Sequence, residues 1–178
     1  MAFAAELADD ELSVRPIHRL VHGLQAVDAR RALQGAFTVV DAGPNTPEGI
    51  AKLRARMRDD GALGLVDRSG LAVLRPTRDV TDVDEVLRDV DSVRFDEHVR
   101  AALPGATVTF RSDAAAVAAL VEKGAADAAV LLRPVTVAQI RAAAFAGVRM
   151  PEKTTFFSPK PRTGMVFRSL DEAGVAPT

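Results

Sequence analysis

The sequence predicts an α+β fold, α/β-like in its last third, in which helices pack on a mixed sheet. Short apolar and β-branched runs, typical of strands, alternate with segments that carry helix-start and helix-stop signals. The last third has the order strand, helix, strand, helix, loop, strand, which is the pattern of helices covering a sheet. The 178 residues suit a single domain over 1–178, and a subdivision would fall in the acidic stretch near 76–106.

Composition excludes several classes of protein. Hydrophobic residues make up 48% of the chain and aromatic residues 4%, with no Trp or Tyr, so the core must be built from Ala, Val, Leu and a few Phe. The lack of Cys excludes disulfides and thiolate chemistry, and the net charge of −1 argues against nucleic-acid binding. No apolar run reaches the ~18 residues that span a bilayer, and the N-terminus lacks the basic region of a signal peptide. We therefore expect a cytoplasmic protein without nucleic-acid or membrane partners.

Local signals place the elements of the first two thirds. Thr46-Pro47-Glu48 supplies an N-cap, a proline at the first helical position and an acid in the first turn, which predicts a helix to about Asp59. The turn ending at Gly70 predicts a hairpin. The other expected elements are an N-terminal hairpin of Ala2–Leu7 and Leu12–Val21, with Pro16 at an edge or bulge; a helix at Val27–Leu33 capped by Asp28 or Gln25; strands at Phe37–Val40, Ala62–Val66 and Leu71–Leu74; and helical segments after Pro76 and at Phe95–Leu103.

The last third has the clearer pattern of strands and capped helices. Its expected elements are a strand at Thr107–Phe110, a helix capped by Ser112-Asp113 and ended by Gly124, a strand at Ala128–Leu132, a helix from Thr136 to Phe145, and a closing strand at Thr163–Arg168.

A long loop, Met150–Gly164, separates the last expected helix from the closing strand. Its prolines exclude a helix, and connections of this length in a compact domain are more often functional than not. The chain has only four lysines, and Lys153 and Lys160 both lie in this loop. In a chain that otherwise uses Arg, we interpret these as positions where a compact ammonium is needed.

An extended backbone over 152–158 would place alternate side chains on opposite faces. Lys153 and Thr155 would then share one face, and Thr154 would lie on the other with Phe156. Ammonium and hydroxyl groups suit an anion, phosphate above all. The alternative is a proline-rich surface crossover with two solvated lysines and one buried Phe.

His18 and Arg19 end the second strand of the expected N-terminal hairpin. His18 and His22 would be ~13 Å apart in a strand, so we predict no metal site there and interpret His18-Arg19 as an anion contact. The alternative is a pair of exposed polar residues at a strand end. The common catalytic motifs are absent from the sequence, which indicates no particular cofactor, substrate or reaction.

Two stretches of the chain resemble a bacterial and archaeal family described as domain of unknown function 1015. The loop MPEKTTFFSPKPRTG is similar to the family pattern M-P-x-K-[ST]-[TS]-[YFW]-F-x-P-K followed by Gly, and PIHRL at Pro16–Leu20 is similar to its P-[IT]-H-R-L element. Family members are usually more than twice this long and carry upstream a D-G-H-H-R type motif, similar to ParB and sulfiredoxin-like proteins, which this sequence lacks. The resemblance therefore implies a C-terminal half.

The resemblance implies phosphate handling, since a relative in the ParB-like group phosphorylates free serine. We expect the binding half of a kinase-like phosphotransferase, inactive as an isolated chain, with a small phosphorylated ligand or nucleotide as partner. The alternative is a non-catalytic interaction domain that packs on the missing N-terminal half or self-associates. The candidate anion-binding residues are Lys153, Thr154, Thr155, Lys160, Arg162, His18 and Arg19.

Overall fold

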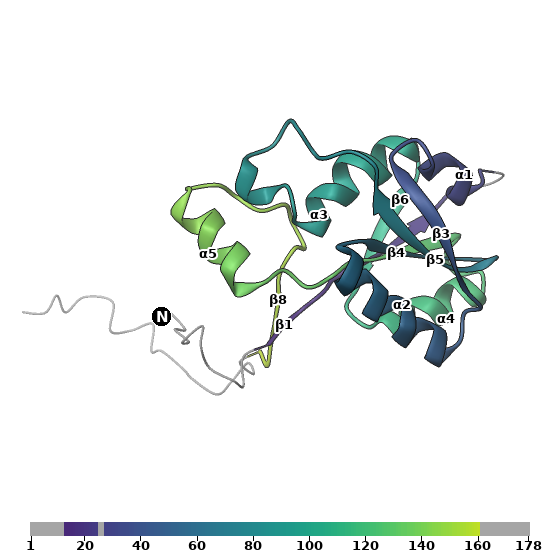
Figure 1. The fold of residues 1–178 in the computed structure, drawn as a ribbon. Helices are drawn as coiled ribbons and strands as arrows, with labels where there is room; N and C mark the ends of the chain where they lie inside the picture. The colour runs from purple at the N-terminus through teal and green to yellow at the C-terminus, as the bar shows by residue number, and fades with distance from the viewer. Residues whose placement is uncertain (1–12, 25–26, 161–178) are drawn as a thin grey trace, which may run out of the picture.

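The computed structural model describes residues 13–24 and 27–160 and has an α+β architecture (Figure 1). Its main sheet has six strands in the order β3-β5-β4-β7-β2-β6, and each neighbouring pair is antiparallel. These strands are β2 (His18–His22), β3 (Phe37–Gly43), β4 (Leu63–Asp67), β5 (Gly70–Pro76), β6 (Thr107–Arg111) and β7 (Ala128–Leu131). The predicted class is therefore confirmed, but the described strands contain no parallel pair and the sheet is not mixed.

Helices cover both faces of the sheet. On one face, α2 (Pro47–Asp60) and α4 (Ala114–Glu122) lie side by side (Figure 1). On the other lie α1 (Ala29–Leu33) and the continuous helical run of α3 (Asp91–Arg94) and the π-helical η2 (Phe95–Arg100). Successive residues of β5 and β7 alternate between the two hydrophobic cores, as the period of a strand requires.

The helix ends follow the signals in the sequence. The hydroxyl of Thr46 accepts from the backbone N–H of Gly49 and caps α2, and Gly61 ends that helix in the left-handed region at φ 62°. Asp28 caps α1. Thr136 and Gln139 form a reciprocal capping box at the start of α5 (Val137–Phe145).

A smaller hydrophobic cluster lies beside the main sheet. There α5 packs against η1 (Glu85–Leu87), and the cluster joins segments 80–93 and 143–150. Next to it, β1 (Ser13–Arg15) pairs antiparallel with β8 (Phe156–Ser158), which brings opposite ends of the chain together (Figure 1). The loop after α5 therefore runs from this cluster to the two-stranded sheet.

Several expectations need correction. The segment expected as one strand at Leu12–Val21 is two strands, because Pro16 separates β1, which pairs with β8, from β2, which enters the main sheet. The acidic stretch after Pro76 forms only the short η1 before α3, not a long helix. The backbone at 152–158 is not extended throughout, since Lys153 has φ 56° and only Phe156–Ser158 is a strand. The strands expected at Ala2–Leu7 and Thr163–Arg168 lie outside the described residues.

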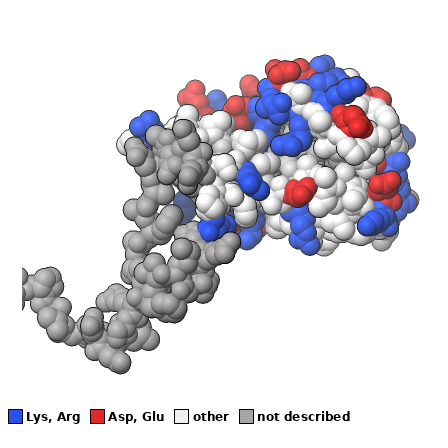
Figure 2. Space-filling view, turned by 90° about the horizontal axis from the view of Figure 1, so that it is seen from below, with Lys and Arg blue, Asp and Glu red and all other residues white. Residues whose placement is uncertain are grey.

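No helix in the described part of the chain is long and apolar enough to cross a bilayer. In the view of Figure 2, lysine and arginine side chains are interspersed with acidic and uncharged ones, and no basic area extends across that face.

Candidate anion-binding site

A cavity of about 240 Å³ lies where the main sheet meets the smaller cluster. Its apolar wall comes from Ile17 before β2 and from residues 132–135 after β7. Three cationic side chains line it from separate elements: Arg58 of α2, Arg133 and Lys153. Since Asp89 and Asp91 also line it, the cationic residues exceed the acidic ones by one. We call this hollow the inner cavity.

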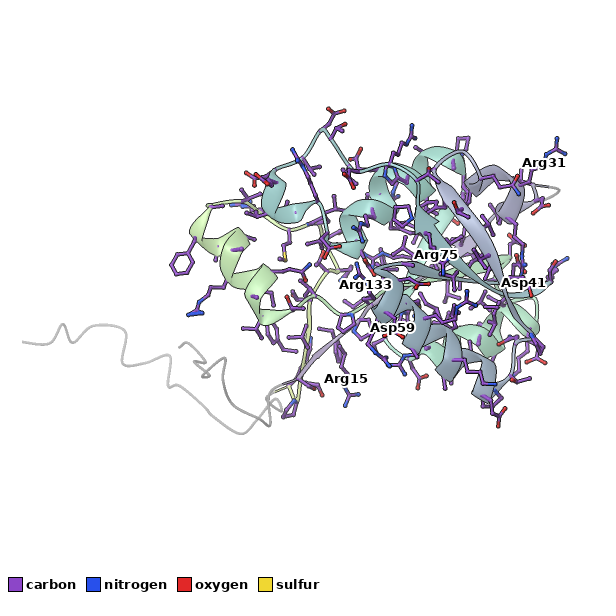
Figure 3. All side chains as sticks on the ribbon, viewed as in Figure 1. Arg15, Arg31, Asp41, Asp59, Arg75 and Arg133 are labelled. Carbon is purple, nitrogen blue, oxygen red and sulfur yellow. The ribbon has the colours of Figure 1, made fainter. Side chains whose placement is uncertain are left out.

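One wall of the inner cavity is an ion-pair network around Arg133, which follows β7 and is labelled in Figure 3. The side chain of Asp91 is 2% exposed and accepts from Arg133 Nη2 at 2.6 Å and from the Arg133 backbone N–H at 2.6 Å. Arg133 Nη2 also reaches Asp89, and Arg94 pairs with the same Asp89 at 2.7 Å. The network fixes the guanidinium of Arg133 through Nε and Nη2.

The two central groups of this network affect one another's pKa. Burial raises the pKa of Asp91, and the hydrogen bonds from Arg133 oppose that rise. Burial disfavours the charged guanidinium, but hydrogen bonds and charge attraction to Asp91 outweigh this effect and raise the pKa of Arg133. We take Arg133 as a permanent cation in the cavity wall because both groups are paired in good geometry.

Lys153 lies on a tight turn at the mouth of the inner cavity. Its φ of 56° is in the left-handed region, which costs a non-glycine residue about 1–3 kcal/mol. The turn is held from behind, because Arg19 Nη1 donates to the carbonyl of Lys153 at 3.1 Å and to that of Ile17 at 2.7 Å. No carboxylate in the described part of the chain lies within ion-pair distance of the Lys153 ammonium.

Arg19 is a positioning residue in this geometry. It is 2% exposed, and its guanidinium lies 4.9 Å from the ring of Phe110 and 5.7 Å from that of Phe95. Burial lowers its pKa, with Asp96 opposing that shift. Arg19 lines neither hollow near Lys153, so its part is to hold the turn.

The hydroxyl of Thr154 is committed to the fold. Thr154 is buried, its Oγ1 donates to the Pro151 carbonyl at 2.7 Å, and it lies 2.7 Å from Ser92 Oγ. Since the Thr154 proton goes to Pro151, the Ser92 hydroxyl donates to Thr154 Oγ1. Thr154 therefore joins the loop to α3 at the edge of the inner cavity.

A second, more open hollow of about 530 Å³ lies on the other side of Lys153. It runs along the end of β6 and is lined by Ile17, residues 108–112, Lys153 and Phe156. Lys160 is at its border, because its Nζ lies 4.9 Å from the centroid of the Phe156 ring. We call this the outer hollow, and Lys153 lines it as well as the inner cavity.

His18 lies beneath the site and not in it. It is 2% exposed, and its Nδ1 accepts from the backbone N–H of Leu132 at 3.1 Å. Burial, with the nearby charges of Arg54 and Arg19, lowers its pKa to about 4, although Asp113 opposes the shift. The imidazole is therefore neutral at pH 7, with its proton on Nε2, and brings no positive charge to an anion.

The structure separates the candidate residues into groups. Lys153 and Thr154 line the inner cavity, and Lys153 and Lys160 border the outer hollow. The sequence suggested that His18 and Arg19 contact an anion, but the structure buries both side chains below the turn. Thr155 is half-buried and lines neither hollow, and Arg162 lies outside the described residues.

Sequence reasoning missed Arg58, Asp91 and Arg133. The signal for Arg133 was present, because a charged residue follows directly on the buried strand Ala128–Leu131 and precedes a proline. Its acidic partner Asp91 lies 42 residues earlier, in the acidic stretch after Pro76 where we expected a helical segment. No group of three or more metal-ligating side chains was found among the residues that the structure describes.

Comparison with solved structures shows that the fold is shared. The chain is similar to a free serine kinase in complex with AMP, with 15% identity and a TM-score of 0.54, over 86% of this chain and 56% of that one. It is similar to a conserved hypothetical protein from Pyrococcus furiosus at 14% identity and a TM-score of 0.53, over 86% of this chain and 59% of that one. A free serine kinase mutant in complex with ADP matches at 13% identity and a TM-score of 0.52, over 86% of this chain and 56% of that one.

These likenesses define the fold and leave the family open. The chain spans little more than half the length of the solved structures that it matches, 56% to 59%. No family model matches the sequence, and no curated protein does. Membership of domain of unknown function 1015 therefore stays a prediction from the two sequence motifs.

Proposed function

We propose that this chain is the phosphate- or nucleotide-binding half of a kinase-like, phosphate-handling enzyme. The observation that carries the proposal is the position of Lys153, which lines two adjoining hollows on a turn that Arg19 fixes from behind. The likeness in fold to free serine kinases that bind AMP and ADP supports a nucleotide as ligand. The rest of the active site would come from a second half, so the isolated chain should bind its ligand without turning it over.

The charges suit binding of phosphoryl oxygens more than chemical attack on them. Lys153 and Arg58 approach the inner cavity from different elements, and Lys160 approaches the outer hollow. Asp91 and Asp89 hold Arg133 through Nε and Nη2, and among the described contacts they do not use Nη1. Positioned cations of this kind stabilise the charge on a transferring phosphoryl group.

Replacing Lys153 by Ala should lower the affinity for ADP and phosphoserine about tenfold or more, because each charge-assisted hydrogen bond contributes about 1.5–3 kcal/mol. Lys160→Ala should have a smaller effect, since Lys160 borders only the outer hollow. Calorimetric titration of the full chain with ATP, ADP, phosphoserine and sulfate measures both. Lys52→Ala is the matched control, because Lys52 is an exposed lysine of α2 and lines neither hollow. Equal binding of every anion by wild type and the Lys153/Lys160 double variant would remove the proposal.

The second candidate function is a non-catalytic interaction domain, and α5 favours it. Phe145 is 86% exposed at the end of this helix, and Val137 at its start is 37% exposed. Contiguous exposed apolar patches mark contact surfaces in proteins, and in this second candidate function Phe145 lies within such a patch. For an interaction domain, wild type should self-associate in sedimentation velocity runs or bind a separately produced N-terminal half. Phe145→Ser should abolish this association and leave anion binding unchanged.

A further inference from the structure

We propose that the outer hollow is the stacking site for the base of a nucleoside phosphate, whose phosphates extend towards Lys153 and the inner cavity. The inference rests on the proposed function. It assigns the base of the ligand to the outer hollow and the phosphates to the inner cavity. It follows from the size, the aromatic side chains and the strand edge of the outer hollow.

Size distinguishes the two hollows. The inner cavity has about 240 Å³, and the outer hollow about 530 Å³. Ligand pockets usually range over roughly 300–1,000 Å³, so the inner cavity is too small for a whole nucleotide. A nucleoside with its sugar fits the outer hollow, and a phosphoryl group with a small acceptor fits the inner cavity.

The outer hollow has a floor that suits a planar base. The chain has only 8 Phe and no Trp or Tyr, yet Phe110 and Phe156 both line this hollow, together with Val108 and Ile17. Stacking of a nucleobase on an aromatic side chain contributes about 1–3 kcal/mol and tolerates any base. Lys160 lies over the Phe156 ring, so one wall presents an aromatic ring and an ammonium together.

The edge of the sheet supplies groups that can recognise the polar rim of a base. Among the described strands, β6 pairs only with β2 and is the last strand of the sheet. The outer edge of β6 therefore faces no described strand, although the Phe110 carbonyl already accepts from Arg111 Nη1 at 2.8 Å. Arg111 and Ser112 at the end of β6 line the same hollow and can reach the sugar or its phosphate.

Lys153 and the apolar Ile17 both line the inner cavity and the outer hollow, and of these two Lys153 carries the charge. A phosphate chain that starts at a base in the outer hollow must pass this ammonium to enter the inner cavity. The left-handed turn at Lys153 places it there, and Arg19 keeps the turn in place.

The test compares AMP with ribose 5-phosphate, which has the same phosphate and no base, on the full chain by calorimetry. Wild type should bind AMP more tightly than ribose 5-phosphate by about 5–150-fold, the equivalent of one stacked base. Phe156→Leu should remove most of this difference and leave ribose 5-phosphate unchanged. Phe145→Leu is the matched control, because Phe145 is exposed on α5 and lines neither hollow.

A second variant covers a failure of Phe156→Leu to fold. Phe156→Trp keeps an aromatic ring and introduces the sole Trp of the chain, whose fluorescence should be quenched by AMP and not by ribose 5-phosphate. Equal affinities for the two ligands, or a Phe156→Leu variant that binds AMP like wild type, would overturn the stacking site while the phosphate site stood. A different result would overturn the proposed function itself, namely a Lys153→Ala variant that binds ribose 5-phosphate like wild type.

Discussion

Replacing Arg133 by Ala should lower the free energy of unfolding by about 3–5 kcal/mol, because it leaves a buried carboxylate without its partner. The Asp91 side chain is 2% exposed, and Arg133 gives it three of its close contacts, from the backbone N–H, Nε and Nη2. Only the backbone contact would remain after truncation, with Arg94 Nη1 at 3.7 Å as a weaker neighbour. Urea denaturation of wild type and variant measures the change.

Two further variants show whether the effect comes from burial. Arg75→Ala breaks the exposed pair with Asp60, at 2.7 Å, and should cost no more than about 1 kcal/mol. The double variant Asp91→Leu with Arg133→Met removes both charges, and it should be more stable than Arg133→Ala alone. If Arg133→Ala were no less stable than Arg75→Ala, the buried network would not make the expected contribution to the free energy of unfolding.

Acid should destabilise the chain between pH 6.5 and about 4 because of His18. Its pKa is lowered from 6.5 to about 4 in the folded state, mainly by burial, so in this window the unfolded chain binds a proton that the folded chain does not. Stability therefore rises with pH across the window, is complete above 6.5, and is lost progressively as the pH falls to about 4. A shift of this size corresponds to about 3 kcal/mol in total.

The variant His18→Gln isolates this contribution. A glutamine oxygen can accept from the Leu132 N–H in place of Nδ1 but cannot take up a proton. The free energy of unfolding of wild type, minus that of the variant, should be largest at pH 7 and shrink as the pH falls from 6.5 towards 4. A difference that stayed constant over this range would contradict a buried, neutral His18. A titration of the His18 imidazole near pH 6.5, followed by NMR, would contradict it as well.

Local signals predicted the capped helices α1, α2 and α5 well, because a cap and its partners lie within a few residues. Thr46 and Thr136 start α2 and α5 where their sequences indicate, and Asp28 caps α1. Pairing between distant segments leaves no such local trace. Nothing near Ser13 or Ser158 in the sequence indicates that these residues lie opposite one another in β1 and β8.

The same limit explains the errors at the site. His18 and Arg19 were interpreted as an anion contact, with exposed polar residues at a strand end as the alternative. In the structure β2 lies between β6 and β7, and both side chains are buried. The lysines of the loop were identified because they are scarce, which composition alone reveals. Arg58, Asp91 and Arg133 converge on Lys153 from three separate segments, and only the packing of those segments brings them together.

The most direct test of the account is a titration of the isotope-labelled full chain with AMP, followed by amide NMR. Ligand at the junction of the two hollows should shift the amides of Lys153, Thr154, Phe156 and Arg111, with saturation at one common dissociation constant. The amides of α1, which lines neither hollow, should keep their chemical shifts, and Lys153→Ala should suppress the shifts at the site. Shifts confined to other surfaces, or none at millimolar AMP, would contradict a nucleotide site at Lys153.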